Sequence, residues 1–113
     1  MKGFAALQKG DYATALKIAK RHTDLSNGQY VLGELYENGG GVLRDYKAAI
    51  KWYKKAANDG HTTAQFNLAL LYVKGKGTPV DNVRGHMWFN IVTALLDKNE
   101  GGDIARGNLD QTE

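Results

Sequence analysis

The chain has 113 residues, which is enough for one domain with one continuous core. Hydrophobic residues make up 42% and charged residues 24%, proportions typical of a globular protein. Because cysteine is absent, a disulfide framework, a thiolate metal site and a cysteine nucleophile are excluded. No apolar run approaches the ~20 residues that span a bilayer, and the net charge of +3 permits an anionic partner without requiring one.

The first predicted element is a short helix over residues 3–8, joined through Lys9-Gly10 to a second helix that begins after Asp11. Because a full first helix would start several residues before Met1, we expect a trimmed or truncated form of a longer repeat array. A signal segment in a longer parent would make the protein periplasmic or exported, whereas a native Met1 favours the cytoplasm.

Apolar residues at helical spacing predict the next four helices, over residues 27–37, 46–58, 63–74 and 82–96. The patterns Ser26-x-x-Gln29 and Thr62-x-x-Gln65 predict capping boxes at the first and third of them.

Other residues predict the remaining ends of these helices. Asp45 and Asp81 precede the second and fourth helix, where an aspartate side chain accepts from free backbone amides and contributes ~1 kcal/mol. Gly39 and Gly75 follow the other two helices, where a left-handed C-cap is expected. Each pair therefore reads as two antiparallel helices joined by a glycine-rich loop.

The two helical pairs are copies of one unit, because they superpose without a gap at an offset of 36 residues. This predicts a single repeat domain, 1–113, with full repeats at 26–61 and 62–97. Residues 1–25 form a diverged first repeat, and residues 98–113 form a linker, a closing helix over 103–109 and a tail. The coinciding residues are Leu32 and Leu68, Tyr36 and Tyr72, Gly39 and Gly75, Gly41 and Gly77, Asp45 and Asp81, and Trp52 and Trp88.

One helical pair cannot bury its apolar face alone, so neighbouring pairs must stack. Small residues at positions 33, 56, 57, 64 and 69 predict close approach of the helices. Large aromatic residues are expected to fill the core between them, with Trp52 as the side chain whose truncation to alanine costs ~3–5 kcal/mol.

The residues from Leu32 to Val42, followed by Asp45 and by Lys47 to Ala57, resemble the Sel-one-like repeat (SLR) family, a relative of the tetratricopeptide repeat with a longer loop. The resemblance covers residues 26–97 well and 3–22 loosely. It implies an all-α fold, an open right-handed α-α superhelix of about two and a half units, used for protein-protein contacts and common in bacterial proteins. It implies no reaction.

The resemblance also implies that, in such stacks, the first helix of each unit lines the concave face and binds a partner segment. An acidic-aromatic patch beside an apolar patch would suit a partner with one basic and one apolar side. An alternative is that Phe66 and Leu70 pack against the closing helix. The predicted partner-binding residues are Tyr30, Glu34, Glu37, Phe66, Asn67, Leu70, Val73 and Lys74.

A second interpretation concerns the second helices, which carry positive charge. Such a face would bind nucleic acid or another anionic polymer, although a solvated convex surface is the simpler interpretation. The residues concerned are Lys47, Lys51, Lys54 and Lys55.

No pattern predicts catalysis. The histidines His22, His61 and His86 are scattered without a pair at ligand spacing, so no metal is predicted. Ser26 is the only serine and has no neighbouring base. The sequence therefore predicts a non-enzymatic adaptor without a cofactor, whose partner is another protein.

Overall fold

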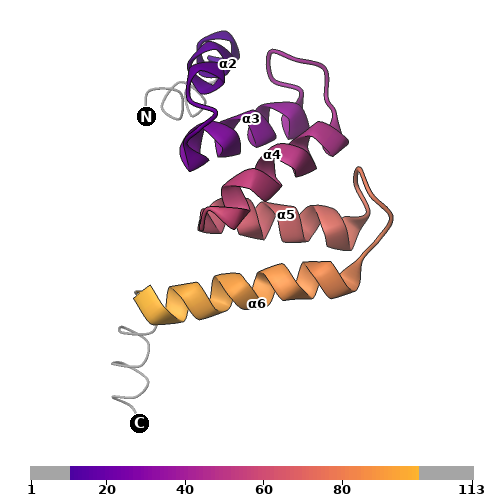
Figure 1. Ribbon diagram of the computed structural model, residues 1–113. Coiled ribbons are helices and arrows are strands. Elements are labelled where there is room, and N and C mark those ends of the chain that lie inside the picture. Colours follow the sequence, from indigo (N-terminus) through magenta and orange to yellow (C-terminus); the bar gives the residue numbers. More distant parts are fainter. Residues whose placement is uncertain (1–10, 100–113) are drawn as a thin grey trace.

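The computed structural model describes residues 11–99, with side chains through residue 94. Within this range the chain is entirely helical apart from its connections, and the helices are stacked one after another (Figure 1). The helices are α2 (Tyr12–Arg21), α3 (Ser26–Asn38), α4 (Tyr46–Asn58), α5 (Thr62–Lys74) and α6 (Asn82–Asn99).

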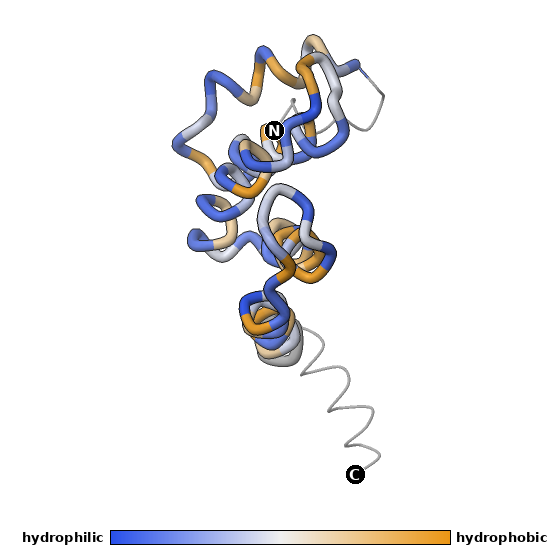
Figure 2. The backbone as a smooth tube through the Cα atoms, turned by 90° about the vertical axis from the view of Figure 1, so that its right-hand side faces the viewer, coloured by the Kyte–Doolittle hydropathy of each residue, from blue (hydrophilic) through white to orange (hydrophobic). Residues whose placement is uncertain are grey.

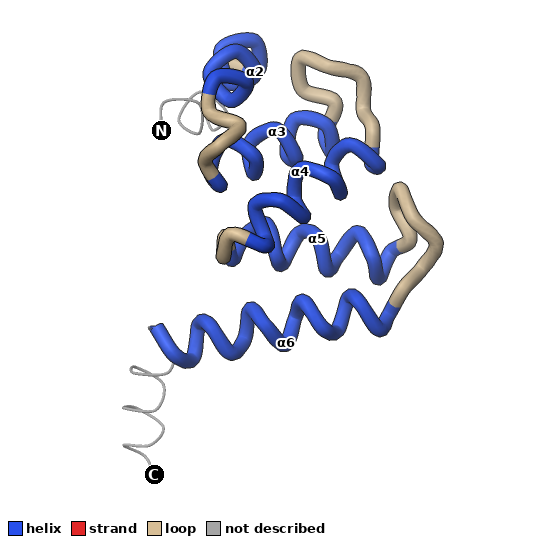
Figure 3. The backbone as a smooth tube through the Cα atoms, viewed as in Figure 1, coloured by secondary structure: helices blue, strands red, loops and turns tan. Residues whose placement is uncertain are grey.

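Each helix packs on the next one in the chain, and α3 also contacts α5. The long loops that join α3 to α4 and α5 to α6 lie on one side of the stack, and the short α4–α5 connection lies on the other (Figure 3). The helices carry both hydrophilic and hydrophobic positions (Figure 2), and the internal helices α3, α4 and α5 each pack against a neighbour on both sides. The predicted all-α repeat architecture is confirmed.

The aspartate N-caps are confirmed as well. Oδ1 of Asp45 accepts from the backbone N–H of Ala48 at 3.1 Å, and Oδ1 of Asp81 accepts from that of Arg84 at 2.9 Å. Asp11 caps α2 in the same way. Each carboxylate satisfies one of the free amides at its helix start, so the three second helices begin at equivalent positions.

The loops repeat in their hydrogen bonds. Gly39 and Gly75 have φ of 74° and 69°, the left-handed conformation that ends α3 and α5. The N–H of Gly40 then donates to the carbonyl of Leu35 at 2.9 Å, and the equivalent N–H of Lys76 donates to Leu71 at 3.0 Å. The N-cap residue of the following helix is also held in place, because the N–H of Asp45 donates to the carbonyl of Tyr36 and the N–H of Asp81 to that of Tyr72.

The predicted capping boxes are wrong. The N-cap of α3 is Leu25, which has no capping side chain, and the N-cap of α5 is His61. The glutamines point backwards instead: Nε2 of Gln29 donates to the carbonyl of Thr23, and Nε2 of Gln65 to that of Ala57. These buried amides tie the start of each first helix to the segment before it, a role that the local pattern could not distinguish from capping.

The core is centred on Tyr53, whose side chain is fully buried, and on small residues at the predicted positions. An ideal Cβ on Gly33 would lie 2.4 Å from Cδ1 of the Tyr53 ring, so only glycine lets α3 approach α4 this closely. The prediction that Trp52 occupies the core is wrong. Trp52 is half-buried at the edge of the core, and Trp88 is placed likewise, so truncation of Trp52 should cost less than the ~3–5 kcal/mol expected of a core aromatic.

Helix α6 continues to Asn99, through Lys98, where a linker was predicted. The predicted helices over 3–8 and 103–109 lie outside the described residues. None of the described helices is long and apolar enough to cross a bilayer.

Candidate functional site

Apart from Tyr30, the predicted partner-binding residues are exposed or half-buried on α3 and α5, and the surface that these two helices form is here called the α3–α5 face. The two halves of this face are joined directly, because Nδ2 of Asn67 on α5 donates to Oε1 of Glu34 on α3 at 3.0 Å. The structure therefore brings together the acidic stripe of one repeat and the polar edge of the next.

The centre of the acidic half is the hydroxyl of Tyr53, which reaches the face from α4. It lies 2.9 Å from Oε1 of Glu34 and 2.6 Å from Oε1 of Glu37, and it donates to these carboxylates. Asn67 Nδ2 lies 3.4 Å from the same hydroxyl. The two carboxylates are thus oriented by a buried tyrosine and by the amide of the following repeat.

No cation neutralises these carboxylates within the described part of the chain. Among the side chains of residues 11–94, the one ion pair joins Arg84 to Asp81. Glu34 and Glu37 are half-buried. The acidic half of the face therefore presents two ordered acceptors with free lone pairs and uncompensated negative charge.

Tyr30 does not lie on the surface as predicted. Its side chain is 7% exposed, because its ring stacks on His61 at 4.6 Å between ring centroids and packs against Tyr53 at 5.9 Å. Burial, reinforced by the negative charge of Glu34, raises the pKa of Tyr30 to about 12. The same causes raise the pKa of Tyr53 further, so both hydroxyls stay protonated at physiological pH and act as donors.

His61 joins the start of α5 to the start of α3. Its Nδ1 accepts from the backbone N–H of Ala64 at 3.1 Å, so the ring proton is on Nε2, which lies 3.0 Å from Oδ1 of Asn27 and donates to it. Burial lowers the pKa of His61. The neutral ring thus caps α5 and links it to the start of α3.

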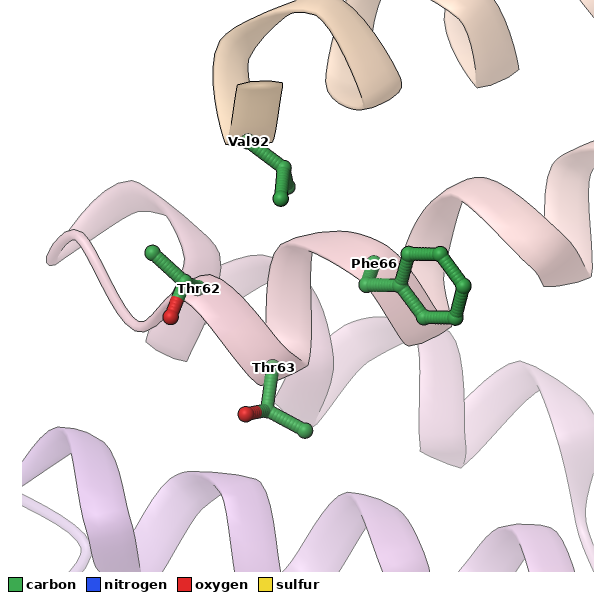
Figure 4. A pocket seen from close by; sticks show the side chains of 4 residues that line it. All are labelled: Thr62, Thr63, Phe66 and Val92. Atoms are coloured by element: carbon green, nitrogen blue, oxygen red, sulfur yellow. The ribbon is translucent and has the colours of Figure 1, made fainter. Parts of the chain in front are cut away.

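The apolar half of the face surrounds Phe66. Its ring contacts Phe89 of α6 at 5.6 Å between centroids, yet 46% of the side chain is exposed. Val92 points from α6 toward the α5 segment that carries Thr62, Thr63 and Phe66, and these four residues line an open cavity of about 260 Å³ (Figure 4). Phe66 therefore both packs against α6 and forms the rim of an accessible recess.

The other predicted residues of α5 differ in exposure. Leu70 is half-buried, and Val73 is half-buried against α6 at Gly85, where an added Cβ would lie 2.5 Å from its Cγ2. Lys74 is exposed in the last turn of α5. Packing of Phe66 and Leu70 on the predicted closing helix, the alternative raised above, concerns residues outside the described range.

The lysines of α4 do not form one row. Nζ of Lys51 and of Lys55 lie over the Trp52 ring, 5.4 Å and 4.8 Å from its centroid. Lys47 and Lys54 instead line a second recess together with Arg84. Helix α4 therefore does not present a uniform basic face.

Several residues of these surfaces were missed from the sequence. Tyr53 is one of the large aromatic residues expected to fill the core, but a buried tyrosine hydroxyl usually needs a hydrogen-bond partner, and this need could have pointed to the glutamates. Phe89 and Val92 lie on α6, where the repeat pattern weakens, so no sequence signal paired them with Phe66. Arg84 could not be assigned to a site from the sequence, because the recess that it lines is formed by segments far apart in the chain.

Metal-binding chemistry has no support in the part of the chain that the structure describes, since it contains no cluster of three or more histidine, aspartate or glutamate side chains able to hold an ion. The prediction of a non-enzymatic protein stays a prediction.

Comparison with known proteins gives consistent similarities. The family model described as Sel1 repeat matches residues 26–61 and 62–91. A crystal structure of a Sel1 repeat protein from Oxalobacter formigenes is similar with a TM-score of 0.75 and 33% identity, over 83% of this chain and 39% of that one. The structure of c5321, a protective antigen of uropathogenic Escherichia coli strains with an SLR fold, is similar with a TM-score of 0.71 and 37% identity, over 74% and 18% of the two chains.

Two curated proteins are also similar. Both are called DAP3-binding cell death enhancer 1, from Rattus norvegicus and Mus musculus, and each is 46% identical over 37 residues. The match covers 33% of this chain and only 7% of either relative. The chain thus spans a small part of these relatives and less than half of the two solved structures.

Proposed function

Because the chain belongs to the Sel1 repeat family, whose repeats generally mediate protein interactions, we propose that it binds a segment of a partner protein on the α3–α5 face. The observation that carries the proposal is the pair of ordered carboxylates, Glu34 and Glu37, which Asn67 joins to the helix that carries the exposed ring of Phe66. The domain acts as an adaptor without chemistry of its own.

The face favours a partner segment with a basic side and an apolar side. Lysine or arginine side chains would donate to the free lone pairs of Glu34 and Glu37, forming charge-assisted hydrogen bonds. A large apolar side chain would enter the recess beside Phe66. Because this recess is about 260 Å³, below the ~300–1,000 Å³ of typical ligand pockets, it suits one side chain of a peptide better than a whole small molecule.

The arrangement of the acidic half also favours affinity. Tyr53 and Asn67 already restrict both carboxylates in the free protein. Less side-chain entropy is therefore lost when a partner binds. The name of the two curated relatives says that they bind DAP3, and we propose that this chain likewise binds a macromolecular partner.

The test is selection from a displayed library of random peptides, followed by fluorescence anisotropy with the synthetic peptides. Selected peptides should carry basic and apolar residues on opposite sides. Glu34→Gln with Glu37→Gln keeps one acceptor oxygen on each side chain but removes both charges, and should weaken binding about tenfold, or ~1.4 kcal/mol. Phe66→Ala should weaken it by a similar factor.

The matched control is Val83→Ala, which truncates an apolar side chain that is 81% exposed. Val83 lies nine residues from Val92, two and a half turns of α6, and is thus on the opposite side of that helix. It should bind like the wild type, and circular dichroism should show that all variants are folded. Selected peptides that lack basic residues, or that bind the Glu34/Glu37 variant as tightly as the wild type, would contradict the proposal.

A further inference from the structure

A second recess lies between α4, the α5–α6 loop and the start of α6. Its cavity has a volume of about 240 Å³. Ile50 and Tyr72 contribute apolar surface to its lining, and Thr78 of the loop also lines it. The charged lining residues are Lys47, Lys54 and Arg84, and neither aspartate nor glutamate lines it.

The cations of this recess are poorly compensated. Arg84 contacts Asp81 through Nη1 at 3.4 Å, in an exposed pair of the kind that contributes little. Lys47 and Lys54 form no ion pair with any side chain in the described range 11–94. Three cations that face one cavity repel one another, so an anion that binds among them relieves this repulsion.

We propose that this recess, here called the cationic recess, binds a phosphate group, either free or as a monoester. A phosphate oxyanion accepts several hydrogen bonds at once, which matches two ammonium groups, one guanidinium and one hydroxyl. The volume is again below the usual range for whole ligands, so the recess takes one anionic group with part of its carrier. The proposal is independent of the α3–α5 face.

The placement of the lysines favours a discrete site over a polymer-binding surface. Lys47 and Lys54 are seven residues apart, nearly two full turns, and so project together into the recess. Lys51 and Lys55 point to the Trp52 ring on a neighbouring side of α4. A nucleic acid bound by diffuse charge would use all four lysines, whereas the recess needs only two of them.

This difference supplies the experiment. Two double variants remove the same charge from the same helix: Lys47→Gln with Lys54→Gln in the recess, and Lys51→Gln with Lys55→Gln outside it. All four side chains are exposed, so both variants should fold like the wild type, as checked by circular dichroism. Titration with inorganic phosphate at ~0.15 M salt, where diffuse attraction is screened, is followed by amide chemical shifts in NMR.

We expect saturable shifts at Gly77 and Thr78 that are lost in the Lys47/Lys54 variant and kept in the Lys51/Lys55 variant. The wild type should bind at least about tenfold more tightly than the recess variant. Equal weakening in both variants, which diffuse binding of nucleic acid or another polyanion predicts, would overturn the proposal, as would the absence of saturable shifts at the loop.

A further comparison identifies the source of the group. A peptide with phosphoserine is compared with its unphosphorylated form and with inorganic phosphate. Tighter binding of the phosphopeptide than of phosphate assigns the group to a modified partner chain, and equal binding assigns it to a free phosphate. Binding of the unphosphorylated peptide as tightly as the phosphopeptide would exclude phosphate recognition.

Discussion

Replacing Tyr53 by phenylalanine removes one hydroxyl and leaves the buried ring in place. The hydroxyl has one proton for two carboxylates, so its loss removes about one hydrogen bond to a charged acceptor, worth ~1.5–3 kcal/mol. Glu34 keeps the amide of Asn67, whereas Glu37 loses the hydrogen bond to Tyr53 and has no other in the described structure. We therefore expect Tyr53→Phe to lower the free energy of unfolding by ~1.5–3 kcal/mol, mainly through Glu37.

The assay is urea unfolding followed by circular dichroism and by tryptophan fluorescence, with agreement of the two probes as the condition for a two-state fit. The matched control is Tyr36→Phe, because the hydroxyl of Tyr36 makes no hydrogen bond within the part of the chain that the structure describes. A double-mutant cycle with Glu37→Gln should show that most of the loss depends on this partner. A Tyr53→Phe variant within ~0.5 kcal/mol of the wild type, the range of neutral surface changes, would refute the proposed role of the hydroxyl.

Two further predictions concern the packing of α3 and the cap of α5. Gly33→Ala should lower the melting temperature, because its Cβ would overlap the Tyr53 ring and such overpacking costs ~1–3 kcal/mol. This cost should exceed the ~1 kcal/mol that alanine gains in helix propensity. A higher melting temperature would contradict the close approach of α3 to α4. His61 has a lowered pKa, so the unfolded chain binds its proton more readily, and the contribution of His61 to stability is complete above pH ~6.5 and is lost as pH falls toward the lowered folded pKa. Unfolding titrations should show this dependence in the wild type and its reduction in His61→Asn, which keeps a neutral capping acceptor; identical profiles would argue against the cap.

Much of the fold was predictable because the same local sequence signals occur in both repeats. The aspartates 45 and 81 and the glycines 39 and 75 each have one physical role, as N-cap oxygen or left-handed C-cap, and the structure confirms both pairs. The large aromatics were assigned less well. Recurrence at 36 residues marked Trp52, yet the neighbouring Tyr53 has its side chain buried in full, because burial depends on which helix packs against which side.

Most residues of the candidate site were predicted from the sequence, but the contacts that join them were not. The sequence assigned Glu34, Glu37, Phe66 and Leu70 to a partner-binding face, but it could not show that Asn67 of one repeat bonds to Glu34 of the other. It also placed Tyr30 with its surface neighbours, although His61 and Tyr53 cover it. Contacts between α4 and the α5–α6 loop define the cationic recess, and a one-dimensional pattern contains no information on them.

The sequential packing of the helices has a consequence for how the domain forms and opens. Nearly all helix-helix contacts join neighbours in the chain, so little loop entropy is lost before they form, and folding should be fast. In a stack whose stability is a sum over adjacent pairs, a terminal helix has one neighbour and opens at lower cost than an internal one. In the described stack α3, α4 and α5 each pack between two neighbouring helices, so the α3–α5 region should be among the last parts of the domain to lose its shape.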